Sequence, residues 1–204
     1  MEKMRQVLVL ALSKLGAEIG SLVATKQAAY GDSFGKSGKV VQILYPHGIA
    51  SEQIDDSLTI VRMIDKLFRI ATDKDALGED PYRDVLGYSV LSIRRLRMER
   101  AENGEAQDYV ALGTEIGAQV FLSPKLPTGC YTETSSVMKV LYPNGINGGT
   151  LLDKVTVKDI VSELLCIATN QEDRESAYRV IANLCLKAIH RRQDHAEMID
   201  RKAA

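Results

Sequence analysis

Aromatic residues are scarce in this sequence, and tryptophan is missing altogether. Aromatics make up 5% of the 204 residues, which argues against a surface that stacks nucleic-acid bases. The formal net charge is −1 at pH 7, so the chain also lacks a basic field that would attract a nucleic-acid backbone. We therefore do not expect nucleic acid as a partner. The hydrophobic fraction of 45% is enough for a globular core.

Cysteine is also scarce. Cys130, Cys166 and Cys185 are an odd number and lack the close spacing of a metal site, which predicts a protein of a reducing compartment. The apolar stretch near the N-terminus, residues 7–12, ends at Ser13, too short for a secretory signal or a membrane-spanning helix. We expect a cytoplasmic protein with no membrane partner.

The chain repeats itself. Three segments of the first half return at the same offset of 97 residues: residues 15–20, 40–49 and 70–72 return as residues 112–117, 137–146 and 167–169. In the first of them, Leu-Gly-Ala-Glu-Ile-Gly becomes Leu-Gly-Thr-Glu-Ile-Gly. A shared offset of this length indicates a duplicated small domain rather than a solenoid. The polar stretch 101–105 contains an Asn-Gly turn signal, so we expect two units, residues 1–100 and 101–204.

Hydrophobic periodicity predicts that both units are helical, giving an all-α protein. In the first unit, apolar residues recur at helical spacing over residues 4–22 and 54–68. Ser51 is placed to cap the second helix, and Asp80-Pro81 is typical of the start of a third.

The connection between the first two helices has a different pattern. Glycine and serine are frequent in residues 30–38, which predicts a loop. Residues 40–45 are the only candidate strand, and Tyr-Pro-His-Gly at residues 45–48 predicts a β-turn.

Each predicted helix of the first unit carries an acidic residue on its apolar face. Glu18, Asp65 and Asp84 lie in line with hydrophobic residues, where a charge is costly unless it is paired or binds a metal. Three carboxylates directed into a helical bundle would form a site suited to Mg²⁺. Asp32 and Asp80 could each add a ligand or hold a metal-bound water.

Basic residues accompany these acids. Arg62, Lys66 and Arg69 bracket Asp65, and Lys36 lies in the predicted loop. Such cations bind phosphates, arginine in a bidentate manner. A simpler interpretation stays open, in which the spacing of Arg62, Asp65 and Arg69 is that of an ion-pair row on a helix surface. By the same logic, Asp80 would be only a helix cap, and Glu18, which has the counterpart Glu115, would be structural.

The second unit keeps the apolar pattern and loses the charged set. At the corresponding positions, Arg62, Asp65, Arg69 and Asp84 are replaced by Asp159, Ser162, Cys166 and either Val180 or Ile181. This pattern is typical of an active unit fused to a degenerate copy that completes a dimer-like interface.

Three groups of residues together resemble a known family: Lys26 with Tyr-Gly-Asp-Ser-Phe at 30–34, Asp-Lys-Leu at 65–67 with Arg69, and Arg-Asp-Val-Leu-Gly-Tyr at 83–88. The resemblance is to phage and bacterial nucleotide-modification-associated helical domains, which are similar to the MazG-type all-α nucleoside triphosphate pyrophosphohydrolases. It covers about residues 18–95 and implies a helical bundle, here duplicated as an intrachain pseudo-dimer. It also implies bound Mg²⁺, nucleotide substrates and a homo-oligomer.

The resemblance also implies roles for single residues. Glu18, Asp65 and Asp84 would be metal ligands, Arg62, Lys66 and Arg69 would face the phosphates, and Tyr30 and Asp32 would shape the mouth of the site. MazG proteins have Glu-x-x-Glu on the central helix, whereas this chain has Arg62-x-x-Asp65. This departure leaves open whether two metals bind and whether substrate is turned over.

The sequence thus favours Mg²⁺-dependent hydrolysis of a nucleoside triphosphate to the monophosphate and pyrophosphate. Two alternatives remain at this point. One is a nucleotide-binding or nucleotide-sequestering protein without catalysis, and the other is a structural interaction protein whose acids form surface ion pairs.

Overall fold

The computed structural model describes residues 2–29, 31–72, 80–100, 108–119, 131–145, 151–169 and 173–203. These residues form eight α-helices and one short 3-10 turn, Ser51–Gln53, and no strand is found among them. The expectation of an all-α protein is confirmed. The helices are α1 (Glu2–Ala29), α2 (Ser33–Leu44), α3 (Ile54–Thr72), α4 (Pro81–Arg100), α5 (Tyr109–Ala118), α6 (Tyr131–Leu141), α7 (Leu151–Thr169) and α8 (Arg174–Ala203).

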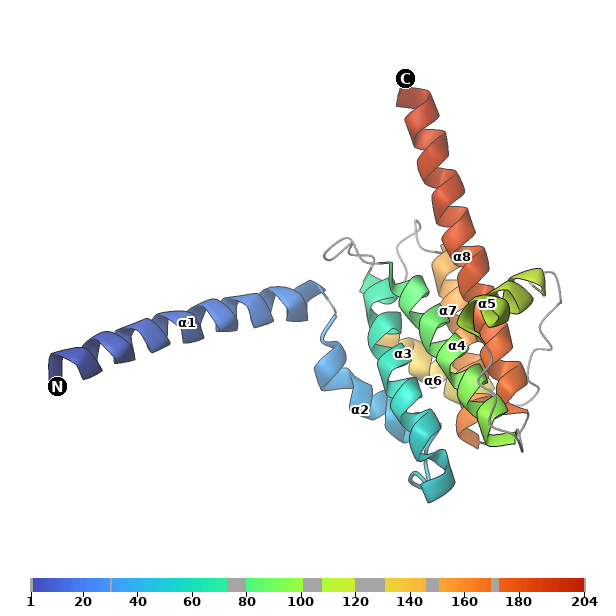
Figure 1. Cartoon of the computed structure of the whole chain (residues 1–204), viewed down its shortest axis with the longest axis horizontal. Helices are drawn as coiled ribbons and strands as arrows, with labels where there is room; N and C mark the ends of the chain where they lie inside the picture. Colours follow the sequence, from blue (N-terminus) through green and yellow to red (C-terminus); the bar gives the residue numbers. More distant parts are fainter. Residues whose placement is uncertain are drawn as a thin grey trace.

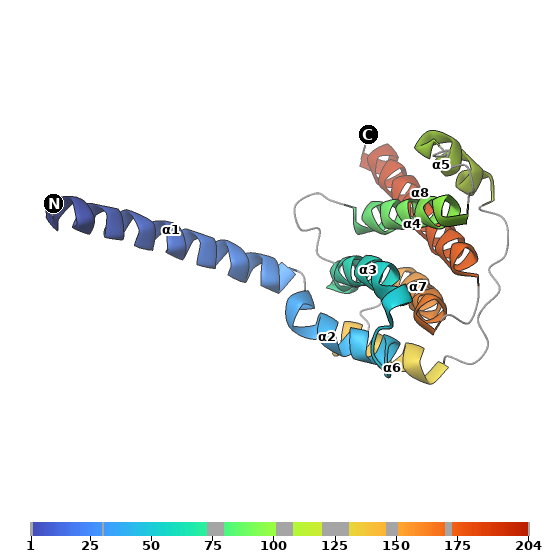
Figure 2. The ribbon, with the colours of Figure 1, turned by 60° about the horizontal axis from the view of Figure 1, so that its bottom comes forward.

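Helices α3, α4, α7 and α8 form the centre of the molecule. Helix α4 packs on α8 and α3, and α7 packs on α8 and α3. Helices α2 and α6 pack on each other and on this central group, and α5 lies against α4 and α8, as Figures 1 and 2 show. Buried hydrophobic residues from both halves of the chain form one continuous core.

Helices at corresponding places in the two halves make reciprocal contacts. Helices α3 and α7 both have 19 residues, and they begin 97 positions apart. The Tyr82 hydroxyl donates to Asp153 Oδ1 at 2.8 Å, and the Tyr178 hydroxyl donates to Asp56 Oδ1 at 2.9 Å. Each tyrosine thus ties the last long helix of one half to the preceding long helix of the other half.

Two local predictions for the first half are confirmed. The Asp80-Pro81 helix start is correct, because α4 begins at Pro81 and Asp80 Oδ1 accepts a hydrogen bond from the Tyr82 N–H at 3.0 Å. The turn after Tyr45 is also present, with the Gly48 N–H donating to Tyr45 O at 3.1 Å. Gly48 has a φ of +88°, which glycine adopts without steric cost.

The predicted loop over 30–38 and the candidate strand over 40–45 are wrong. Residues 33–44 form α2, which buries Val40 and Leu44, one turn apart, in the core. Tertiary packing of this apolar face outweighs the weak helix propensity of Gly35 and Gly38. The cap assigned to Ser51 is also wrong, because Ser51 begins the 3-10 turn and the Gln53 side chain accepts from the Ala50 N–H at 2.9 Å.

Helix α1 projects away from the rest of the molecule in both views (Figures 1 and 2). The expectation that no segment has the apolar length of a membrane span is wrong. Within the described part of the chain, one helix is long and apolar enough by length and composition, over Lys3–Ala28. Ser13 and Lys14 interrupt the apolar run in sequence, but Leu15, Ile19 and others continue it beyond them. A signal sequence or a core helix meets the same criteria, so the finding alone assigns no membrane.

Candidate functional site

The acids and bases of the first half meet where α3 and α4 lie side by side. Lys66 Nζ, on α3, is 3.1 Å from Asp84 Oδ2 on α4 and 3.9 Å from Asp65 Oδ2. Arg69, one turn further along α3, places Nη1 3.8 Å from Asp84 Oδ2. The Arg69 side chain is only 3% exposed, and a buried guanidinium requires a nearby acid or acceptor. Two carboxylates and two cations from neighbouring helices therefore form one cluster.

The start of α2 contacts this cluster from a third direction. Ser33, the first residue of α2, is buried, and its hydroxyl donates to Asp65 Oδ1 at 2.7 Å. The N-terminus of a helix carries partial positive charge, which favours a nearby carboxylate. Asp65 is therefore held in its orientation by α2 through Oδ1, while Oδ2 faces Lys66 Nζ at 3.9 Å.

A tight corner at Gly31 and Asp32 sets the place where α2 begins. Both residues have positive φ, +63° and +60°. A Cβ on Gly31 would come within 2.5 Å of Thr72 Cγ2, so the close approach of this corner to α3 requires glycine. The Asp32 N–H donates to Gln27 O at 3.2 Å, the Gln27 amide donates to the Asp32 carboxylate, and Lys36 Nζ donates to Gly31 O at 2.8 Å.

A cavity of about 740 Å³ opens beside this corner. Its charged lining residues are Asp32 and Lys36, joined by Gln27 at the end of α1 and Thr72 at the end of α3. The turn after α6, residues 142–145, closes the opposite side. Its volume is in the range of small-molecule sites, and both halves of the chain contribute to its wall.

Other predicted site residues lie elsewhere. Glu18 is exposed on α1, and this helix projects away from α3 and α4, which carry Asp65 and Asp84 (Figure 1). Arg62 is exposed on α3, and Tyr30 lies outside the described residues. Asp80 caps α4 and lies 3.6 Å from Arg192 Nη1, so it belongs to a different contact.

The predicted set of three carboxylates is therefore not brought together. Among the described residues, no group of three or more Asp, Glu, His or Cys could hold a metal ion. Asp65 and Asp84 still provide two carboxylates, both within 4 Å of Lys66 Nζ, at 3.9 and 3.1 Å. Proteins commonly bind Mg²⁺ through one or two carboxylates, with water and substrate phosphates completing the shell. If Mg²⁺ binds here, these two acids would hold it together with water and substrate phosphate.

In the second half, the counterparts of Asp65, Arg69 and Asp84 are uncharged, whereas the counterpart of Lys66 is the buried acid Glu163. Ser162 Oγ lies 3.3 Å from Thr134 Oγ1, and Cys166 is a buried free thiol. The reciprocal tyrosine contacts align Tyr82 with Tyr178, which makes Val180 the counterpart of Asp84. A neutral contact thus stands where the first half has paired carboxylates.

Sequence reasoning missed Ser33, Gln27, Thr72 and the turn at residues 142–145. The only local signal was the Tyr-Gly-Asp segment, because a glycine followed by aspartate is typical of a corner with positive φ. The interpretation of Arg62, Asp65 and Arg69 as a row along one helix missed the strongest contact, since Lys66 pairs with Asp84 on the neighbouring helix.

Comparisons of the chain with protein-family models, with curated proteins and with solved structures found no match.

Proposed function

We propose that the first half of the chain is a Mg²⁺-dependent hydrolase that converts a nucleoside triphosphate to the monophosphate and pyrophosphate. One observation carries the proposal: Asp65 and Asp84, from two helices, both face Lys66, and Asp84 also lies 3.8 Å from Arg69. We further infer that the second half is a degenerate copy, which completes a MazG-like pseudo-dimer within one chain. The sequence repeat and the reciprocal tyrosine contacts support this origin.

In this proposal the acidic side chains would bind the metal and the basic side chains would bind the phosphates. Asp65 and Asp84 would hold Mg²⁺, which neutralises phosphate charge and lowers the pKa of an attacking water. Lys66 pairs with Asp84 before ligand binds, and it would turn to a phosphate oxygen once Mg²⁺ takes over the carboxylate. Arg69 is buried and fixed, so its guanidinium offers a preorganised contact to a non-bridging oxygen.

The cavity beside Gly31 and Asp32 is the place we assign to the nucleoside. It adjoins the start of α2, whose Ser33 contacts Asp65, so a triphosphate that extends from the cavity past Ser33 would approach the charged cluster. Tyr142, contributed by the second half, lines it with Pro143. The resemblance of the Tyr-Gly-Asp and Asp-Lys-Leu segments to nucleotide-modification-associated domains favours a nucleotide as the occupant.

The test is product release from a panel of ribo- and deoxyribonucleoside triphosphates with Mg²⁺. The protein is expected to release pyrophosphate from one or a few of them, and Asp65→Asn is expected to abolish release. Asp55→Asn, at an exposed acid on the same helix, is the matched control and should keep full activity. Circular dichroism would show that each variant is folded. Full activity in Asp65→Asn would contradict the assignment.

A second candidate is a nucleotide binder without turnover. Two observations favour it. The cluster has two carboxylates among the described residues, and Lys66 contacts both of them, where a catalytic metal would have to bind. A binder would show a ligand-dependent rise in Tm with no product, whereas a purely structural protein would show neither.

A further inference from the structure

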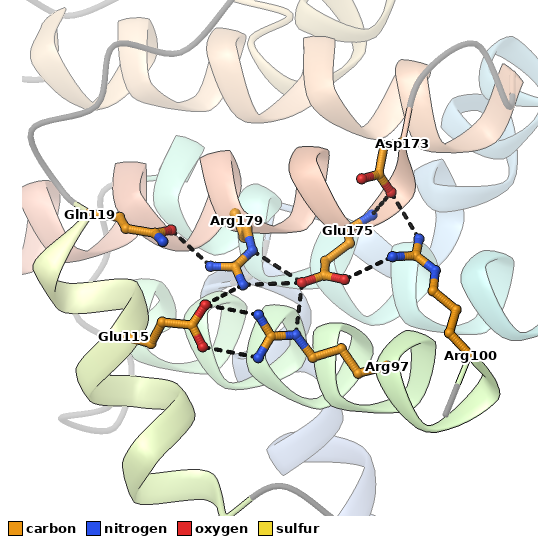
Figure 3. A network of polar contacts seen from close by, with 7 residues as sticks. All are labelled: Arg97, Arg100, Glu115, Gln119, Asp173, Glu175 and Arg179. Atoms are coloured by element: carbon orange, nitrogen blue, oxygen red, sulfur yellow. Dashed lines mark hydrogen bonds and ion pairs between the residues drawn. The ribbon is translucent and has the colours of Figure 1, made fainter. Parts of the chain in front are cut away.

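Helix α5 is held against α4 and α8 by an apolar pair and an acid. Leu112 and Ile116 are 0% and 1% exposed. Between them, Glu115 accepts two hydrogen bonds from Arg97, at 2.8 and 2.9 Å, and one from Arg179 Nη2 at 2.6 Å. Figure 3 shows both arginines converging on this carboxylate from α4 and α8. The chain thus provides a binding site for α5 on α4 and α8, with Arg97 and Arg179 as its charged residues, and we call this site the α5 seat.

The corresponding segment of the first half, in α1, is not covered by α4 and α8 of its own chain. Leu15, Glu18 and Ile19 correspond to the three residues that hold α5, and they lie in the same order in α1. Leu15 is 51% exposed and Ile19 is 52% exposed. Figures 1 and 2 both show α1 directed away from α4 and α8. The apolar residues of α1 that correspond to the buried residues of α5 are therefore exposed along one helix face. Such an exposed apolar face indicates an interaction surface.

The repeat predicts where the matching seat lies. Tyr82 and Tyr178 set an offset of 96 residues between α4 and α8. At this offset, Arg83 corresponds to Arg179, and Gln193 corresponds to Arg97. Arg83 has an exposed side chain, 64% accessible, and its Nε lies 3.8 Å from Asp80 Oδ2. The seat equivalent to that of α5 thus offers an exposed guanidinium to an incoming carboxylate.

The groove next to these residues is open. A cavity of about 740 Å³ lies along α8 at the end of α5, lined by Leu186, Ile189, His190 and Gln193 of α8, among others, and by Gly117 of α5. On α4, a Cβ added at Gly87 would meet nothing within 4 Å. An apolar helix face with one acid, as α1 has, matches this lining of aliphatic and polar side chains.

The chain's own α1 cannot enter the groove in this conformation. Helix α5 ends at Ala118, whose counterpart is Ser21, but α1 continues unbroken to Ala29. Its end is then fixed by the contacts of Gln27 with Asp32. The helix therefore leaves on the side of α2, which leaves both its apolar face and the groove available to another molecule.

We propose that α1 of one chain packs in the groove between α4 and α8 of a second copy, so that two chains exchange their first helices. The partner's Glu18 would pair with Arg83, as Glu115 pairs with Arg179. Exchange of an identical element is a low-cost route to a symmetric dimer, because the contact already exists within one chain. A lipid bilayer is a poorer occupant, since Lys14 and Glu18 lie near the middle of the apolar helix.

The mass of the full-length protein in detergent-free buffer, measured by size-exclusion chromatography with light scattering, tests the exchange. The wild type is expected to be a dimer, and the double variant Leu15→Asp/Ile19→Asp is expected to be a monomer that keeps its circular dichroism. Leu10→Asp, at an exposed residue on the opposite face of α1, is the matched control and should stay dimeric. A monomeric wild type, or a dimer that survives the double variant, would overturn the proposal.

A charge exchange tests the seat itself. Glu18→Arg and Arg83→Glu should each raise the dimer dissociation constant at least severalfold, and the two together in one chain should restore it. Failure of the double variant to restore the dimer would overturn the placement of Glu18 at Arg83. Flotation of wild-type protein with neutral phospholipid vesicles, lost equally in Leu10→Asp and Leu15→Asp, would assign α1 to the membrane instead.

Discussion

The ammonium of Lys66 lies 3.1 Å from a carboxylate oxygen of Asp84. This contact joins α3 to α4, and at the counterparts of Lys66 and Asp84 the second half has Glu163 and Val180, which cannot form the same ion pair. The Asp84 side chain is 38% exposed, so both partners can be reached from solvent, and the pair can open at modest cost. We therefore expect this ion pair to open when a ligand binds.

Replacement of Lys66 should change the affinities for nucleoside triphosphate and for Mg²⁺ in opposite directions. In Lys66→Gln, loss of the ammonium should weaken binding of a nucleoside triphosphate by about 10- to 100-fold, the usual value of a charge-assisted hydrogen bond. Affinity for Mg²⁺ alone should rise, because no cation competes for Asp84. Isothermal titration calorimetry measures both, with Lys39→Gln, an exposed residue of α2, as control. Unchanged affinity for both ligands would contradict the role of Lys66.

Glycine at position 31 should be essential to the corner before α2. Gly31→Ala forces a non-glycine residue to a φ of +63° and brings its Cβ within 2.5 Å of Thr72, so the free energy of unfolding should fall by about 1–3 kcal/mol. Gly38→Ala, in mid-helix with open space around it, should instead raise it by about 0.5–1 kcal/mol. Urea unfolding compares them, and equal stability of the two variants would exclude this account of the corner.

The buried carboxylate of Asp56 should contribute more to stability than its counterpart Asp153. Asp56 is 2% exposed, and it accepts hydrogen bonds from Arg95, from Arg174 at 2.7 Å and from Tyr178 at 2.9 Å. Asp56→Asn leaves the partly buried Arg95 and Arg174 without their acid and should cost about 3–5 kcal/mol. The Asp153 side chain is 20% exposed, so Asp153→Asn should cost less. The opposite order in urea unfolding would refute this ranking.

Alkaline pH should unfold the protein through its buried tyrosines. Burial, followed by the neighbouring Asp153 and Asp56, raises the pKa of Tyr82 and Tyr178 above the ordinary value of 10.0. The folded state then keeps protons that the unfolded chain releases, so stability is complete below pH 10 and falls as the pH rises above it. Each tyrosine should contribute a slope of about 1.4 kcal/mol per pH unit.

The tyrosine variants check this slope. The double variant Tyr82→Phe/Tyr178→Phe should show a flatter loss of stability between pH 10 and 11.5 in urea unfolding. Tyr131→Phe, at a residue that is 79% exposed, should keep the slope of the wild type. A slope that is the same in all three proteins would show that other groups cause the alkaline loss.

Local signals in the sequence were enough for the features that depend on neighbouring residues. The start of α4 follows from Asp80 and Pro81, and the turn at Tyr45 to Gly48 follows from proline and glycine chemistry. Helix α2 could not be predicted in this way, because Gly35 and Gly38 weaken it and only the burial of Val40 and Leu44 makes it stable.

The candidate site was predictable in part for the same reason. Asp65 and Asp84 stood out as acids on apolar helix faces, and the structure brings them to one cluster. Glu18 carried the same signal, yet it lies on α1, whose face is not covered within the chain. Ser33 was missed because its contact with Asp65 joins residues 32 positions apart, and no local pattern reports a contact of that range.

Pyrophosphate release by Asp84→Asn, on whichever nucleoside triphosphate the wild type hydrolyses best, tests the central claim most directly. The account predicts Mg²⁺-dependent release by the wild type and loss of at least a hundredfold in the variant, with Tm and circular dichroism preserved. Release that is independent of Mg²⁺, or unchanged in Asp84→Asn, would contradict the claim that the paired carboxylates of α3 and α4 form the active site.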